Sequence, residues 1–146
     1  MNHRYLFLDL RDITSMEHVH RRVYTPQRHP ENPILQGEND WERFASLYGT
    51  VLRDQQNGTF KMWYLTSPHK DGFVQIRGRR ALGNCTLLGY AESHDGVRWH
   101  KPVLNQVDVA GSTANNLIDV GRSNCEGFAV LYDQRDPDPQ RRYKGF

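Results

Sequence analysis

The sequence has few apolar residues and no long hydrophobic run. Apolar residues make up 37% of the 146-residue chain, and the mean hydropathy is −0.78. Nothing approaches the roughly 18 consecutive apolar residues of a transmembrane helix, and the first residues lack the apolar run of a signal peptide. We therefore expect a cytoplasmic protein that neither spans nor binds a membrane.

The chain also has little excess of positive over negative charge, with a net charge of +2. So small an excess argues against a dedicated nucleic-acid surface. Short basic runs occur at Arg77, Arg79 and Arg80 and again at Arg141 and Arg142. Solvated loops and strand ends explain runs of this length, and a site for an anion such as a sugar phosphate is the alternative.

Only two cysteines are present, Cys85 and Cys125, and they lie far apart. Two such thiols define neither a disulfide framework nor a zinc site, so we expect free, buried thiols, with a bridge as the alternative. His18 and His20 fall on one side of an extended segment. No third metal ligand is identifiable nearby, and we predict neither a metal nor a cofactor.

What the sequence does contain is short runs of β-forming residues separated by turns. Asn57-Gly58 and Asp95-Gly96 are dipeptides that close tight hairpins. The runs predict four consecutive strands, at residues 49–53, 60–65, 87–93 and 97–104. Joined in sequence, with residues 66–84 as a long loop, they would form a meandering all-β sheet of the size of a propeller blade.

The second of these strands is apolar on both faces. Met62 and Tyr64 point to one side, whereas Trp63 and Leu65 point to the other. A strand of this kind is buried on both faces, as happens when sheets stack against one another. We predict that neighbouring layers cover residues 60–65 on both sides.

Further strands are expected near both ends of the chain. Residues 5–8 predict a short buried strand, and residues 115–120 another. Residues 126–133 repeat the pattern of residues 48–54, an apolar strand followed by an acid and a polar turn, and residues 142–146 would begin the next strand. We interpret this as an internal repeat with a spacing of roughly 80 residues.

Several of these motifs together resemble a known group of proteins. The succession comprises His29-Pro-Glu-Asn-Pro-Ile-Leu35, Trp41-Glu42, Gly49-Thr-Val-Leu52, Lys61-Met-Trp-Tyr64, Tyr90-Ala-Glu-Ser93, Asp95-Gly-Val-Arg-Trp99 and Lys101-Pro102. It is similar to the N-terminal part of the five-bladed β-propeller glycosidases related to glycoside hydrolase families 32, 43 and 130. The resemblance covers residues 24–146 and is most specific over residues 90–99.

The resemblance implies a longer protein of about five blades. On that basis residues 1–40 form an N-terminal extension, residues 41–104 the first blade, and residues 115–146 the start of the second. The sequence ends inside a predicted strand, which suggests a fragment. A fragment that lacks later blades would be inactive on its own.

The same resemblance implies carboxylates on the inner strands of successive blades, which cleave a glycosidic bond by acid/base catalysis. The first-blade aspartate has no counterpart in residues 47–50, so the nearest candidate is Glu42. The second-blade acid would be Glu126, and the third would lie beyond Phe146. If these roles fail, Glu42 is a solvated loop acid and Glu126 a strand-end acid.

Binding of the carbohydrate substrate would fall to residues near the funnel rim. Trp41 and Tyr48 are candidate aromatic platforms and His29 a candidate polar contact, whereas Trp63 and Trp99 lie in strand patterns and are expected in the core. Fold alone does not decide function. The alternative to a glycosidase is a non-catalytic carbohydrate-binding or scaffold propeller, which the missing first-blade aspartate favours.

Overall fold

The structure, a computed structural model, describes residues 9–11, 13–69, 74–76, 78–81, 85–122 and 124–146. Nearly all of its regular structure is antiparallel strand, and the described part contains one short 3-10 helix, Pro139–Arg141. The all-β prediction is therefore confirmed. The strand predicted at residues 5–8 and the basic residue Arg77 lie outside the described residues. None of the described residues forms a helix long and apolar enough to cross a membrane.

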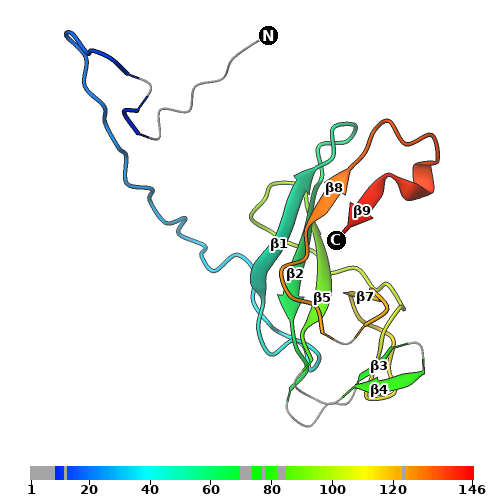
Figure 1. Ribbon diagram of the computed structural model, residues 1–146. Coiled ribbons are helices and arrows are strands. Elements are labelled where there is room, and N and C mark those ends of the chain that lie inside the picture. The colour runs from blue at the N-terminus through cyan, green and yellow to red at the C-terminus, as the bar shows by residue number, and fades with distance from the viewer. Residues whose placement is uncertain (1–8, 12, 70–73, 77, 82–84, 123) are drawn as a thin grey trace.

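The main sheet has four antiparallel strands in the order β1-β2-β5-β7 (Figure 1). They are β1 (Ser46–Arg53), β2 (Phe60–Thr66), β5 (Leu87–Ser93) and β7 (Leu117–Ile118). The β1–β2 hairpin closes through Gly58, whose φ of 76° suits a glycine. Three strands thus lie where the sequence predicts them, and β7 lies within the strand predicted at residues 115–120.

The strand predicted at residues 97–104 is wrong. This segment makes one isolated bridge to the sheet, between His100 and Glu92, and then leaves it. Pro102 has no N–H to continue a ladder, and the Leu104 N–H donates instead to the Asn115 carbonyl at 2.8 Å. The segment therefore becomes the wall of a pocket, and β7 takes the fourth place in the sheet.

A second, smaller sheet has the order β4-β3-β6 and lies beside the β7 end of the first (Figure 1). Its strands are β3 (Val74–Ile76), β4 (Arg79–Ala81) and β6 (Asp108–Val109). The prediction that residues 66–84 form a loop throughout is therefore wrong for β3 and β4. The turn between them passes through Gly78, at a φ of 75° that a glycine tolerates.

Strand β2 is buried on both faces, as the sequence predicts. Trp63 and Leu65 pack on one side in a cluster with Leu88, Cys125 and Val130. On the other side Met62 and Tyr64 pack with Ala91, covered by Leu35, Ala45 and Trp99. Trp63 and Trp99 contribute to these cores as expected. Strands β2 and β5 are thus covered by protein, whereas Leu47, Tyr48 and Val51 of β1 remain exposed.

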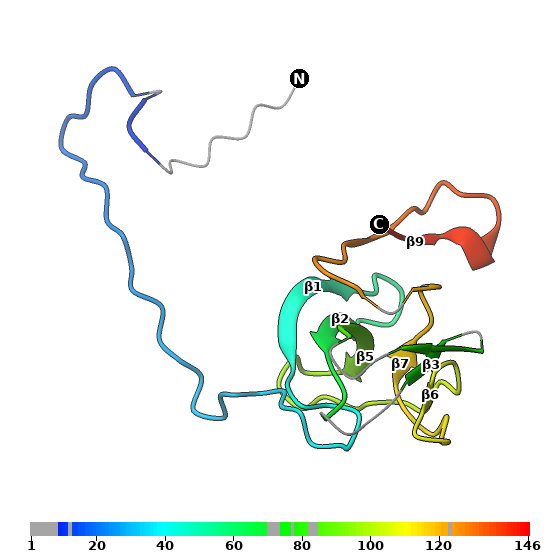
Figure 2. The same ribbon diagram turned by 60° about the horizontal axis from the view of Figure 1, so that its bottom comes forward.

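Strands β8 (Val130–Tyr132) and β9 (Tyr143–Gly145) form a second hairpin. Strand β8 begins at Val130, later than the predicted residue 126. Gly127, whose φ is positive at 65°, lies before the strand. Pairing extends one step further, since Ala129 and Phe146 exchange backbone hydrogen bonds of 3.0 and 3.1 Å. The hairpin lies against the first sheet rather than continuing it (Figure 2).

The two hairpins close with the same set of contacts. In the first, the Asp54 N–H donates to the carbonyl of Thr59 at 2.8 Å and its carboxylate pairs with Lys61 at 3.2 Å. In the second, Asp133 donates to the carbonyl of Arg142 at 2.8 Å and pairs with Lys144 at 2.8 Å. The acid that ends the first strand thus has the same two partners in both hairpins, a backbone carbonyl and a lysine.

Both cysteines are free and buried, as predicted. Cys85 belongs to a cluster with Val107 and Leu117, and Cys125 lies under β2. Burial raises the pKa of both thiols. At neutral pH they are therefore protonated core residues.

Candidate functional site

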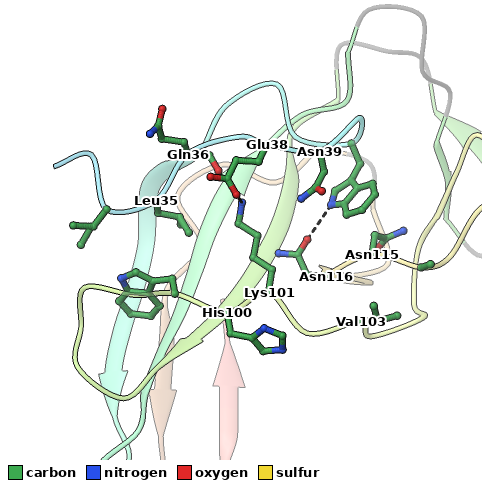
Figure 3. A pocket seen from close by; sticks show the side chains of 13 residues that line it. Leu35, Gln36, Glu38, Asn39, His100, Lys101, Val103, Asn115 and Asn116 are labelled. Atoms are coloured by element: carbon green, nitrogen blue, oxygen red, sulfur yellow. Dashed lines mark hydrogen bonds and ion pairs between the residues drawn. The ribbon is translucent and has the colours of Figure 1, made fainter. Parts of the chain in front are cut away.

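A pocket opens between residues 34–41, which precede strand β1, and residues 99–116, which follow strand β5. Its cavity volume is about 340 Å³, within the range of small-molecule sites. In Figure 3, Leu35, Gln36, Glu38 and Asn39 line one wall, and residues of the later segment line the other. The described lining residues are Ile34, Leu35, Gln36, Glu38, Asn39, Trp41, Trp99, His100, Lys101, Val103, Ala114, Asn115 and Asn116.

Beneath the first wall lies Glu42, whose side chain is fully buried, with 0% exposed. Its carboxylate accepts hydrogen bonds from the Tyr64 hydroxyl, from Asn39 Nδ2 at 3.0 Å and from Lys101 Nζ at 2.7 Å. A buried charge is tolerable only when it is paired and hydrogen-bonded in this way. The sequence expectation of a solvated loop acid is therefore wrong for Glu42.

Lys101 ties the two walls of the pocket together. Its ammonium donates to the Glu42 carboxylate and, at 2.7 Å, to the backbone carbonyl of Gln36. The Glu38 carboxylate lies 3.9 Å away. With 12% of its side chain exposed, Lys101 lies mostly inside the protein. Its stem follows the pocket wall in Figure 3, so the ammonium fixes the spacing of segments 36–42 and 100–103.

Tyr64 extends this network from β2 toward the second wall. Its hydroxyl donates to Glu42 and accepts a hydrogen bond from Asn116 Nδ2 at 2.6 Å. Burial, followed by the neighbouring Glu42 carboxylate, raises the pKa of Tyr64 well above its ordinary range. The phenol therefore stays protonated and keeps donating to Glu42.

The aromatic ring of Tyr64 needs a glycine opposite it. Tyr64 pairs with Gly89 of β5, and a Cβ built on Gly89 would lie 2.6 Å from the ring atom Cζ. No ordinary side chain fits at that distance. Gly89 therefore lets the ring lie across β5 and bring its hydroxyl to Glu42.

Asn116 carries the network to Trp41. The Asn116 amide donates to the Tyr90 carbonyl at 2.8 Å and accepts from Trp41 Nε1 at 2.9 Å, the bond drawn in Figure 3. These contacts fix the edge of the indole, and the ring packs on the Cys85 cluster. Trp41 is thus a rigid aromatic wall of the pocket.

Polar groups at the pocket rim remain accessible to a ligand. The Glu38 side chain is 70% exposed, and Gln36 and His100 are exposed as well. They supply a carboxylate, an amide and an imidazole, all of which hydrogen-bond to hydroxyl groups. Trp41 and Trp99 add two aromatic rings to the lining. The site can therefore hold a small polar molecule that also has an apolar face.

The structure brings some of the predicted site residues to this pocket and not others. Trp41 lines it, and Glu42 lies directly behind its Lys101 wall. His29 borders a separate hollow with Arg28, Asn32 and Pro33. Tyr48 is 70% exposed on β1, and Glu126 is exposed before β8. His29, Tyr48 and Glu126 do not line the pocket.

Sequence reasoning missed Lys101, Tyr64 and Asn116 as parts of the site. Two of them stand inside motifs that the sequence already offered, Lys61–Tyr64 and Lys101–Pro102. Lys101 lies in residues 97–104, which the sequence predicts as a strand, and no local signal marks it as the partner of Glu42.

Among the described residues, no group of three or more His, Cys, Asp or Glu side chains could hold a metal ion. His18 and His20 are both exposed in the N-terminal segment. No family model, no curated protein and no solved structure matches the chain. The functional argument therefore rests on the pocket and its chemistry.

Proposed function

We propose that this protein binds a carbohydrate in the pocket between residues 34–41 and residues 99–116. The observation that carries the proposal is the lining, in which two tryptophans accompany accessible amide, imidazole and carboxylate groups. A sugar ring has an apolar C–H face that packs on an aromatic ring, and a rim of hydroxyls that hydrogen-bond to such polar groups. A cavity of about 340 Å³ suits a ligand the size of one or two sugar rings.

We further propose that the chain is the first blade and the start of the second blade of a β-propeller of the glycosidase type. Three features support this. The main sheet has four antiparallel strands, both faces of β2 are covered, and the β8–β9 hairpin repeats the closing contacts of β1–β2. Radial packing of four-stranded sheets, each covered by its neighbours, is what a propeller requires.

Hydrolysis stays a prediction from the resemblance. Glycoside cleavage needs two carboxyl groups across the scissile bond. Glu42 is buried and paired with Lys101, so it does not reach the pocket. Glu38 is the one carboxylate among the described lining residues. The pocket therefore supports binding better than cleavage, and Glu42 fits the role of a residue that positions Lys101.

The binding proposal is tested with the 146-residue chain and a panel of neutral mono- and disaccharides. Titration followed by NMR or calorimetry should detect saturable binding, together with a change in tryptophan fluorescence. His100→Ala should weaken binding about 5-fold, the effect of losing one hydrogen bond of roughly 1 kcal/mol. The His100 side chain is exposed, so this variant should fold normally.

The matched control is His94→Ala, which removes an exposed histidine that does not line the pocket. It should bind like the parent protein. The proposal is wrong if no sugar in the panel binds, or if the two histidine variants weaken binding equally. Release of nitrophenol from aryl glycosides by the same samples tests a separate expectation, that the chain is inactive on its own because the third carboxylate of the resemblance would lie beyond Phe146.

A further inference from the structure

The described lining residues of the pocket include one lysine and no arginine, and the charge of that lysine is already compensated. Lys101 donates hydrogen bonds of 2.7 Å to the Glu42 carboxylate and to the Gln36 carbonyl. Its charge also lies 3.9 Å from the Glu38 carboxylate. Little of the ammonium is therefore left to attract a negatively charged ligand.

The local charge balance is negative. Two carboxylates, Glu38 in the lining and Glu42 behind it, face one ammonium, and the described lining contains no other Asp, Glu, Lys or Arg. The excess carboxylate is Glu38, which lies at the accessible rim. A ligand that enters the pocket therefore meets a negative charge first and a neutralised lysine behind it.

We infer that Glu42, by neutralising Lys101, makes the pocket selective for uncharged and amino sugars over sugars that carry a carboxylate, sulfate or phosphate. The inference rests on the proposed carbohydrate function and names the class of sugar the site takes. Like charges brought together at a binding site oppose association, and this repulsion sets specificity more than affinity. Glu42 is thus a specificity-determining residue that acts through Lys101 without touching the ligand.

The test compares matched ligands that differ in charge. Glucose, mannose and galactose are each titrated as the neutral sugar, the 2-amino sugar and the uronic acid, against the 146-residue chain. The uronic acids should bind about tenfold more weakly than their neutral parents, and the amino sugars at least as tightly. Equal binding of uronic acids and neutral sugars would overturn the inference while leaving the carbohydrate proposal intact.

Two variants separate charge selectivity from a general structural role. Glu42→Gln keeps an oxygen that can accept from Lys101 but removes the compensating negative charge, so the ratio of uronic-acid to neutral-sugar affinity should rise about tenfold. Because removing one partner of a buried ion pair is strongly destabilising, Glu38→Gln provides a second variant at an exposed position. It should raise the same ratio about 3-fold and weaken amino-sugar binding. A merely structural role would lower all affinities together and leave the ratio unchanged.

Glu31→Gln serves as the matched control, since it makes the same charge change at an exposed residue outside the pocket. It should leave the affinity ratio as it is in the parent chain. An unchanged ratio in either Glu42→Gln or Glu38→Gln, or an equal rise in Glu31→Gln, overturns the inference. If none of the nine sugars binds, the proposed function itself falls, and this inference falls with it.

Discussion

At the residue scale, the site depends on the missing side chain of Gly89. The Tyr64 ring occupies the space where a Cβ would stand, 2.6 Å from Cζ. Gly89→Ala should push the ring aside, weaken its hydrogen bond to Glu42 and lower the free energy of unfolding by about 1–3 kcal/mol, as overpacking in a core does. Denaturant unfolding measures the loss.

The control makes the Gly89→Ala substitution in a variant that lacks the Tyr64 ring. In a Tyr64→Ala background, Gly89→Ala should cost much less, because no aromatic atoms lie against the new methyl group. Equal costs in both backgrounds would mean that the backbone of β5, and not the ring, resists the substitution. That result would remove Gly89 from the account of how Tyr64 reaches Glu42.

Individual residues also show which contacts of the site could not be predicted from the sequence. The resemblance points to Glu42 only as the nearest acid to an expected position, and to Trp41 as a platform for a sugar. The sequence places Lys101 59 residues after Glu42, and nothing local indicates that they form an ion pair of 2.7 Å. A long-range pair of this kind depends on the tertiary path of residues 97–104, which the sequence predicted wrongly as a strand.

At the element scale, Lys61 connects the two hairpins. Its ammonium pairs with Asp54 in its own hairpin. It also donates a hydrogen bond to the Tyr143 hydroxyl of β9 at 2.7 Å. It lies over the Tyr143 ring as well, 4.9 Å from the centroid. Lys61→Met should therefore loosen the second hairpin, with hydrogen exchange of the Val130–Tyr132 amides about 5-fold faster, equivalent to roughly 1 kcal/mol.

Two neighbouring variants define the cause. Tyr143→Phe keeps the ring but removes the hydroxyl, so it should accelerate exchange in β8 in the same direction. Asp54→Asn weakens the pair within the first hairpin and should act mainly on the turn at residues 54–59. If Lys61→Met speeds exchange only in that turn, the bridge to Tyr143 contributes nothing to the docking of the second hairpin.

Elements could be predicted where the local pattern decides them. Strands β1, β2 and β5 combine β-forming residues with turn signals, and the structure has them within a few residues of the predicted bounds. Strands β3 and β4 are three residues each, too short for a pattern to separate them from a loop. Residues 97–104 have the right composition for a strand, but Pro102 and the contacts of Lys101 draw them away from the sheet.

At the scale of the whole molecule, burial is concentrated around the main sheet, and residues 14–28 lie away from it. Residues 14–33 are all exposed, and in both views the described part of this segment runs out from the sheet (Figures 1 and 2). Contact with the core begins at Leu35, which packs against Met62 and Tyr64. The stability of the sheet should therefore be independent of the chain before residue 29.

Deleting residues 1–28 should change the melting temperature by less than about 2 °C, because none of the described residues among them belongs to a core cluster of the sheet. Deleting residues 1–36 should lower it by several degrees, since Leu35 leaves the core and Lys101 loses the Gln36 carbonyl. Thermal unfolding followed by circular dichroism compares the two. If the shorter deletion destabilises the protein as much as the longer one, the N-terminal segment packs on the sheet in solution, and the pocket wall extends further along the chain than residues 34–41.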